Sequence, residues 1–245
     1  MIRLVDLYKS FNSLDVLKGL SLNINRGETM VVLGRSGCGK SVLLKVILRL
    51  LPLDSGEVWF GELNTSDFTD FQMVPIRRRI GMLFQGSALF DSMTVFDNIA
   101  YPLLEHTTLS HDEIVERIRR MLEFVEMEGT EHKMPGELSG GMKKRIALAR
   151  ALVANPDYVF FDEPTTGIDP ITASRINKLI VKTRQEYNVT SIVVTHDIAS
   201  ALFVGDRFSF IYDGKIIFVG DKSEFLACDI PAVKNFRENA LWNTE

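Results

Sequence analysis

Cysteines and long apolar stretches are both scarce in this sequence of 245 residues. The two cysteines, Cys38 and Cys228, lie far apart, so they indicate neither a disulfide framework nor a cysteine metal site; this usage is typical of a reducing compartment. The longest stretch without a charged residue, Ile80 to Phe90, is much shorter than the ~18–20 apolar residues that span a bilayer. The N-terminus lacks the apolar core of a secretory signal and predicts a strand instead. Any membrane role must therefore come through a partner.

An excess of positive charge is also absent. Lys and Arg number 28 against 32 Asp and Glu, which gives a formal net charge of −4. A general nucleic-acid binder carries a basic balance, so no nucleic-acid partner is expected. The composition, 46% hydrophobic and 24% charged, is that of a globular chain, and its length is enough for one domain with a large core and a subdomain.

What the sequence does contain is a glycine-rich stretch, Gly34 to Ser41 (GRSGCGKS), which fits the phosphate-binding pattern G-x-x-x-x-G-K-[ST]. The apolar run Thr29 to Leu33 before it predicts a buried strand. Apolar residues at helical spacing from Val42 to Leu50 predict a helix after it. A strand, a loop and a helix in this order are the context that a P-loop needs.

The residue types of this loop predict a nucleotide site. Its glycines allow the backbone to turn so that successive N–H groups point into one hollow, and a helix that begins near Lys40 adds its positive dipole end. Lys40 would bring a charge to the β- and γ-phosphates, and the Ser41 hydroxyl would bind Mg²⁺. We interpret Cys38 as a small loop residue that donates a backbone N–H. The glycines are Gly34, Gly37 and Gly39.

Strands alternate with helices along the rest of the chain. Residues 1–33 predict a small antiparallel layer with a turn at Asn12-Ser13, and Asp213-Gly214 predicts a hairpin turn. Alternation predicts a mainly parallel sheet whose ligands bind at the carboxyl ends of the strands. We therefore expect the P-loop, Gln85, the pair Asp162-Glu163 and His196 along one edge. Further strands are predicted at 57–60, 80–84, 158–161, 190–195, 208–212 and 215–219, and helices at about 139–154, at about 173–186 and from 222 onward.

Residues 86 to 136 lack strand alternation and predict a mostly helical insert. A capping box from Ser110 to Glu113 opens one helix, and Gly129 is a plausible C-terminal cap. Between them an apolar stripe recurs at helical spacing. The stripe consists of Ile114, Ile118, Met121, Leu122 and Val125.

Two further motifs carry chemistry. Ser139 is a good N-cap, and the two glycines that follow it leave the helix end bare for an anion. Asp162 and Glu163 come at the end of an apolar strand, and since a buried unpaired carboxylate is costly, such a pair is more typical of a site than of a core. Phe11 precedes a turn; by itself such an aromatic belongs more often to a core than to a ligand site.

This set of motifs resembles the ATP-binding cassette (ABC) ATPases over essentially the whole chain. The P-loop, Gln85, LSGG at Leu138 to Gly141, Asp162-Glu163, the turn Thr166 to Asp169 and His196 occur in the family's order and approximate spacing. The resemblance implies an α/β fold, a P-loop NTPase with an ABC-type nucleotide-binding domain, an antiparallel β subdomain and a helical subdomain. It implies one domain over 1–245: a core with its β layer at about 1–85 and 137–220, a helical insert at about 86–136 that extends into the signature helix, and a helical tail at about 221–245.

The resemblance also implies a role for each matched residue. Glu163 would be the general base for the attacking water, Gln85 and His196 would orient water and γ-phosphate, and Phe11 would stack on adenine. The Mg²⁺ ligands would be Ser41, Gln85 and Asp162, the last through water. The phosphates of ATP would be held by Gly34, Arg35, Ser36, Gly37, Cys38, Gly39, Lys40, Ser41 and Val42. In a homodimer, ATP on one subunit would be closed by Ser139, Gly140, Gly141 and Met142 of the other, with Asp169 also among the nucleotide-binding residues.

Within that family the chain is most similar to the ATPase subunit of the MCE-linked (Mla-type) lipid transporters. Met142 replaces the usual glutamine of the signature, and both the segment Gly86 to Thr107 and Asp169 to Thr172 match the subfamily. This implies phospholipid transport between the membranes of a bacterial envelope, with an integral membrane permease and an MCE-domain lipid-binding protein. The ATPase would lie peripherally on the cytoplasmic face of the inner membrane. A chloroplast relative would normally carry a transit peptide, and the sequence shows none, so a bacterial location is expected. Val42 and Met142 depart from the general pattern but leave Ser139 and its glycines, so activity is expected.

The segment after Gln85 is apolar at Leu89, Phe90, Val95 and Phe96. We expect some of these side chains in the core and others in a groove that receives a cytoplasmic helix of the permease. Three alternative functions remain. The ATPase of a polar-solute importer shares every catalytic motif; a soluble ABC protein is disfavoured by the single motif set; and a non-hydrolytic regulator is disfavoured by the intact Glu163.

Overall fold

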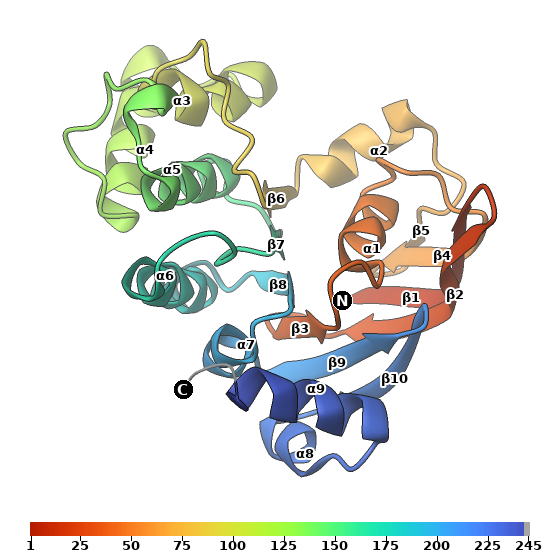
Figure 1. Cartoon of the computed structure of the whole chain (residues 1–245). Helices are drawn as coiled ribbons and strands as arrows, with labels where there is room; N and C mark the ends of the chain where they lie inside the picture. The colour runs from red at the N-terminus through yellow and green to blue at the C-terminus, as the bar shows by residue number, and fades with distance from the viewer. Residues whose placement is uncertain (243–245) are drawn as a thin grey trace. The chain divides into compact units, whose positions relative to one another are not determined.

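The structure, a computed structural model, describes residues 1–242, with side chains through Glu238 (Figure 1). Residues 243–245 of the predicted tail lie outside the described residues. The chain divides into two compact units. One comprises Met1–Val74 with Thr190–Glu245, and the other comprises Pro75–Val189. Within the described part, no helix is both long and apolar enough to cross a membrane.

The first unit contains the predicted antiparallel layer. Strand β1 pairs antiparallel with β2 on one side and β4 on the other, and the β1–β2 turn falls at the predicted Asn12-Ser13, where Asn12 adopts a left-handed φ of 52°. The strands lie in the order β2-β1-β4-β5. Their bounds are β1 (Ile2–Phe11), β2 (Leu14–Ile24), β4 (Ser55–Phe60) and β5 (Leu63–Asn64).

A second sheet of the same unit is built around a fully buried central strand, β3 (Thr29–Leu33). It pairs in parallel with β8 (Thr190–Thr195) and with β9 (Arg207–Tyr212), and β10 (Lys215–Gly220) returns antiparallel to β9 through the predicted hairpin turn. Leu33 pairs with Thr195, so the carboxyl ends of β3 and β8 coincide. The loops that follow these two strands therefore leave from the same edge.

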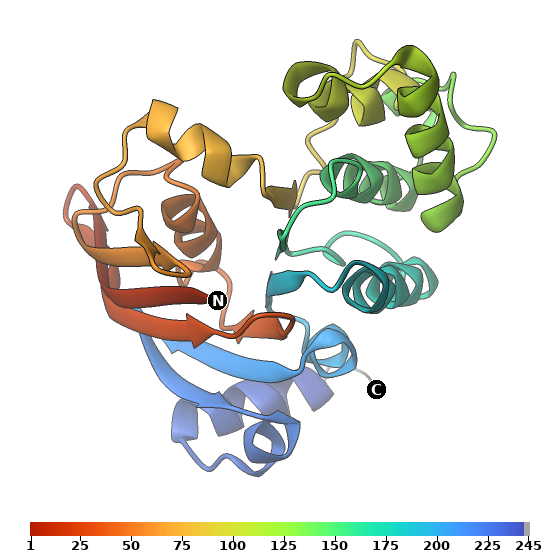
Figure 2. The same ribbon diagram turned by 180° about the vertical axis from the view of Figure 1, so that it is seen from behind.

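The helices of this unit are α1 (Lys40–Ile47), α7 (Ile198–Val204), α8 (Lys222–Ala227) and α9 (Pro231–Trp242), and α2 (Asp70–Arg77) spans the unit boundary. In both views α8 and α9 lie against the β9–β10 hairpin (Figures 1 and 2). Helix α1 ends before the predicted Leu50, because Arg49 turns into the left-handed region at φ 51°. Helices α2 and α7 were not predicted: one contains a proline, and the other has only seven residues.

The second unit joins a short parallel pair of strands, β6 (Ile80–Leu83) and β7 (Tyr158–Asp162), to four helices. A Cβ placed on Gly81 would lie 2.3 Å from the carbonyl oxygen of Ala151, so α5 packs directly on β6. The helices are α3 (Val95–His106), α4 (His111–Phe124), α5 (Gly140–Leu152) and α6 (Pro170–Tyr187), with a 3-10 turn, η1, at Pro135–Glu137.

Helix α4 begins as predicted and ends differently. The Ser110 hydroxyl accepts from the Glu113 N–H at 3.4 Å, the Glu113 carboxylate accepts from the Ser110 N–H at 2.8 Å, and the predicted apolar stripe is buried. Gly129 is not the C-terminal cap. Glu126 takes the left-handed position at φ 56°, and the Met127 N–H donates to the Leu122 carbonyl at 2.8 Å, which is a Schellman ending.

Candidate active site

The P-loop of the first unit connects β3 to α1, as predicted. Gly37 and Gly39 adopt φ values of +78° and +100°, a region that side-chain-bearing residues avoid. A Cβ on Gly39 would also lie 2.8 Å from the Cγ1 of Val16, so this position requires glycine. Gly39 is the N-cap of α1 and has no side chain that could compete for the first helical N–H groups. The loop therefore fits an anion at the positive end of a helix.

Lys40 carries the charge of this loop. Its side chain is nearly buried, with 5% exposed, and its ammonium donates to the carbonyls of Gly34 at 2.8 Å and Arg35 at 3.1 Å. These contacts hold the ammonium beside the loop. A buried cation at the N-terminus of a helix suits an anionic ligand, so the residues present fit the phosphates of ATP.

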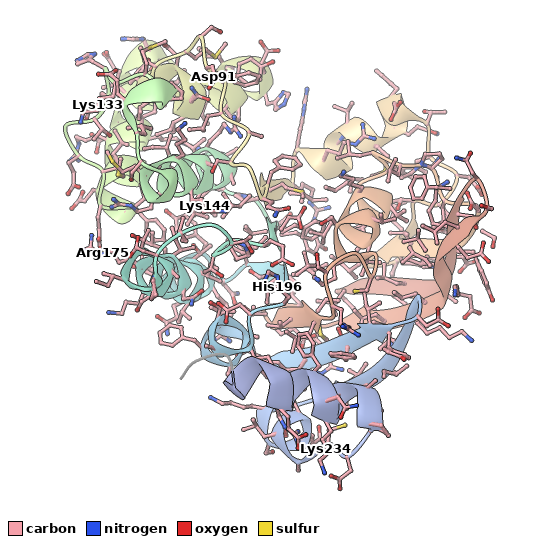
Figure 3. All side chains as sticks on the ribbon, in the orientation of Figure 1. Asp91, Lys133, Lys144, Arg175, His196 and Lys234 are labelled. Atoms are coloured by element: carbon pink, nitrogen blue, oxygen red, sulfur yellow. The ribbon has the colours of Figure 1, made fainter. Side chains whose placement is uncertain are left out.

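His196 follows β8 directly and so lies at the same edge as the P-loop. A cavity of about 710 Å³ is lined by His196, by Arg35 and Ser36 of the P-loop, and by side chains of β9, β10 and the α9 region; His196 is labelled in Figure 3. Phe11 ends β1 with 39% of its surface exposed, and the Lys9 ammonium lies 5.4 Å from its ring centroid. Phe11 is therefore not a core residue, and its stacking on adenine stays a prediction.

The second unit brings together Gln85 and the two acids. Leu83 of β6 pairs with Phe161 of β7, so Gln85 follows one strand at the edge where the other ends with Asp162 and is followed by Glu163. Both acids are nearly buried, with 6% and 7% of their surfaces exposed. That this edge and the edge of the P-loop form one site stays a prediction.

Glu163 is held in an unusual backbone conformation. Its φ is 47°, in the left-handed region, and the Thr166 hydroxyl donates to its carboxylate at 3.1 Å. The Thr166 N–H donates to the Glu163 carbonyl at 3.3 Å. These contacts orient a carboxylate at the end of a buried strand, as a general base requires.

A charged residue that the sequence analysis missed lies behind this group. The Lys144 ammonium on α5 donates to the backbone carbonyls of Gln85 at 2.9 Å and Glu163 at 3.4 Å. Burial lowers the pKa of Lys144, while the charges of Asp162 and Glu163 raise it in part. The one feature of the sequence that could have indicated its burial is its position four residues before Leu148, on an apolar stripe of the helix.

The signature residues open α5 as predicted. Ser139 is the N-cap, and its hydroxyl accepts from the Met142 N–H at 3.3 Å. A Cβ on Gly141 would lie 2.2 Å from the Cγ2 of Thr172, so this glycine also allows α5 and α6 to approach closely. Asp169 caps α6, where its carboxylate accepts from the Thr172 N–H at 3.0 Å. Hydrogen bonds from the Thr172 side chain and then from its N–H lower the pKa of Asp169.

The segment after Gln85 divides between core and surface, as expected. Val95 is fully buried, whereas Phe90 and Tyr101 are 42% and 38% exposed, with ring centroids 5.0 Å apart. We call these two rings the aromatic patch. The buried Asn98 fixes the turn beneath it, because its amide bonds the backbone N–H and carbonyl of Phe90 at 2.9 and 3.1 Å. Arg150 of α5 places its guanidinium 5.6 Å from the Phe90 ring centroid.

Three curated relatives resemble this chain along most of its length. It is 39% identical to the protein TRIGALACTOSYLDIACYLGLYCEROL 3, chloroplastic, of Arabidopsis thaliana, with 96% of this chain and 73% of that protein covered. It is 39% identical to the intermembrane phospholipid transport system ATP-binding protein MlaF of Escherichia coli, covering 90% and 82%. It is 38% identical to the probable ribonucleotide transport ATP-binding protein mkl of Mycobacterium tuberculosis, covering 94% of this chain but 64% of that protein. The chain thus spans slightly less than two thirds of this last relative.

Two solved structures of ABC transporter proteins also resemble this chain. A dimeric structure of MJ0796, a bacterial ABC transporter cassette, has a TM-score of 0.84 and 34% identity over 90% of this chain and 98% of that chain. The structure of cbiO1 from Clostridium perfringens, part of an ABC transporter complex, has a TM-score of 0.85 and 30% identity over 97% and 98%. These similarities confirm the predicted fold class. The family model described as ABC transporter matches residues 17–166, and this chain therefore belongs to the ABC transporter family as one of its ATP-hydrolysing cassettes.

Proposed function

We propose that this cassette drives phospholipid transport between the membranes of a bacterial envelope. The observation that carries the proposal is 39% identity to a protein named as the ATP-binding protein of an intermembrane phospholipid transport system, over 90% of this chain. Met142 in the signature and the segment 86–107, which resemble the same subfamily, also support it. A polar-solute cassette is the alternative, and 38% identity to a probable ribonucleotide transport ATP-binding protein favours it.

The roles proposed for the site residues follow from their chemistry. The P-loop N–H groups and Lys40 bind the phosphates of ATP. The hard oxygen donors of Ser41, Gln85 and Asp162 suit Mg²⁺, which when bound neutralises charge on the phosphates. Glu163 accepts the proton of the attacking water, and His196 and Gln85 orient the water and the γ-phosphate. Phe11 stacks on the adenine ring.

The proposed partners are a second copy of this chain, an integral membrane permease and an MCE-domain lipid-binding protein. In the dimer, Ser139 to Met142 of one copy and Asp169 close on the ATP of the other. MJ0796, a cassette with 34% identity, was solved as a dimer, which supports this arrangement. The aromatic patch takes a cytoplasmic helix of the permease, so that the cassette lies peripherally on the cytoplasmic face of the inner membrane. We retain the division into one ABC domain with a helical subdomain at about 86–136.

Glu163→Gln tests the hydrolytic site. General-base catalysis contributes typically 10²- to 10⁴-fold, so turnover is expected to fall by about that factor while ATP remains bound. Glu62→Gln, at an exposed position, is the matched control. Unchanged turnover in Glu163→Gln would show that another group is the base.

Co-purification tests the transported substrate. The tagged cassette is extracted from native membranes in detergent, and the chains that accompany it are identified by mass spectrometry. A multispanning permease together with an MCE-domain protein is the expected result. A permease with a solute-binding protein instead would favour the polar-solute alternative, and the absence of a membrane partner would refute both transport proposals.

A further inference from the structure

Lys144 occupies a position where a lysine requires an explanation. It lies on the buried face of α5 with 4% of its surface exposed, one turn before the fully buried Leu148, and is labelled in Figure 3. A buried charge is costly unless hydrogen bonds compensate it. The Lys144 ammonium donates to two backbone carbonyls, of Gln85 and Glu163, and the negative charges of Asp162 and Glu163 also stabilise it. Lys144 therefore holds main chain through hydrogen bonds, in addition to its charge interaction with the two acids.

The two carbonyls belong to segments that need to be held. Glu163 has a left-handed φ of 47°, and beyond Gln85 the residues Ser87 and Ala88 have φ values of 63° and 48°. Such conformations are disfavoured outside glycine and persist only where the surroundings impose them. Lys144 contacts the chain at both places at once. It joins the residue after β7 to the segment after β6.

The same helix makes a second contact of this kind. Arg150, less than two turns beyond Lys144, donates to the Ser87 carbonyl at 3.1 Å. The segment after Gln85 is thus held at two points by cations of α5, and α5 begins at the signature residue Ser139. Lys144 extends this connection to Glu163.

We propose that Lys144 is a positioning residue of the hydrolytic site, which holds the main chain of Gln85 and Glu163 in register with the signature helix. The proposal rests on the roles proposed above for Gln85 and Glu163. Movement of the segment after Gln85 is then transmitted to Glu163 through one ammonium group. Since Lys144 lies outside the P-loop, it affects the hydrolytic step and leaves ATP affinity unchanged.

Three substitutions at this position test the proposal in the full chain. Lys144→Arg keeps the charge and the donors, Lys144→Gln keeps one donor group without charge, and Lys144→Met keeps only the length. Lys143→Met, on the same helix, is the matched control. For each variant kcat and KM for ATP, the melting temperature and the affinity for a fluorescent ATP analogue are measured, with wild type and Glu163→Gln in the same series.

We expect kcat to decrease in the order wild type, Lys144→Arg, Lys144→Gln, Lys144→Met. The kcat of Lys144→Met should fall on the order of 10- to 100-fold, the loss expected when a charge-assisted hydrogen bond that positions the base is removed, while KM and analogue affinity stay within twofold. If Lys144→Met does not fold, the proposal is tested by comparing kcat of Lys144→Gln with kcat of Lys144→Arg. Equal kcat in all folded variants, or an equal loss in Lys143→Met, would overturn the proposal.

A loss that follows ATP affinity, instead of kcat alone, would likewise overturn it. Failure of the proposed function is seen separately, because then Glu163→Gln would turn over like wild type. In that case the role proposed for Lys144 would also be refuted, because it depends on Glu163 as the general base.

Discussion

Phe90→Ala removes one of the two rings of the aromatic patch and separates a docking role from a structural one. The change leaves the local backbone supported, because Asn98 bonds the main chain of Phe90 rather than its ring. It also leaves the hydrogen bond from Arg150 to the Ser87 carbonyl in place. The backbone of this segment should therefore keep its conformation after the ring is removed.

The loss of stability follows from the contacts of the ring. Its pair with Tyr101 contributes about 0.5–1.5 kcal/mol beyond burial, and the Arg150 guanidinium above it about 0.5–1 kcal/mol. With 42% of Phe90 already exposed, the burial term is also reduced. A total of about 1–3 kcal/mol is less than the roughly 5–15 kcal/mol that holds a domain together, so the variant should fold.

Urea denaturation measures that loss, and two activities measure the consequence. ATP turnover of the isolated cassette should stay within about twofold of wild type. Transport by the cassette assembled with its permease should fall at least tenfold, because the proposed contact with the permease helix is lost. Tyr101→Phe, which keeps both rings, is the control and should transport normally.

Two results would refute the reasoning. Global unfolding of Phe90→Ala would mean that the ring is a core element despite its exposure. Normal transport by a folded Phe90→Ala would mean that the permease docks elsewhere.

Three further predictions concern the fold. Gly81→Ala should destabilise the chain by about 1–3 kcal/mol in urea denaturation, because the added Cβ would meet the Ala151 carbonyl at 2.3 Å; no change would mean that α5 sits farther from β6. Ser110→Ala should cost about 1 kcal/mol in the same assay through loss of the N-cap, and Ser110→Thr should restore it. Two arginines lower the pKa of Glu116 from 4.5 to about 2, so its stabilisation is present above about pH 4.5 and is lost as pH falls toward 2; in Glu116→Gln, thermal melts should show a smaller drop over that window.

Several features of this protein could be predicted from the sequence because they depend on residues that are neighbours in the chain. The P-loop needs only a strand, the glycines and Lys40 in the right order. The caps at Ser110 and Ser139 satisfy N–H groups three residues away, and the hairpin turn Asp213-Gly214 joins adjacent strands. In each case the physical requirement and the residues that meet it lie within a few positions. The order of the motifs then indicated the family.

Other features were decided by contacts between distant residues. Helix α4 ends at a left-handed Glu126 rather than at Gly129, because Val125 and Met127 on either side of it are buried and fix the chain there. Helical propensity alone favours the glycine. Packing of the tertiary structure overrides it.

Lys144 is the clearest case in the candidate site. Its two carbonyl partners lie 59 and 19 residues away in the sequence, and both are backbone groups that every residue carries. No pattern of side chains could therefore point to them. The sequence by itself indicated which residues we propose for the nucleotide chemistry, whereas only the packing of α5 against the ends of β6 and β7 decided which main-chain carbonyls this lysine contacts.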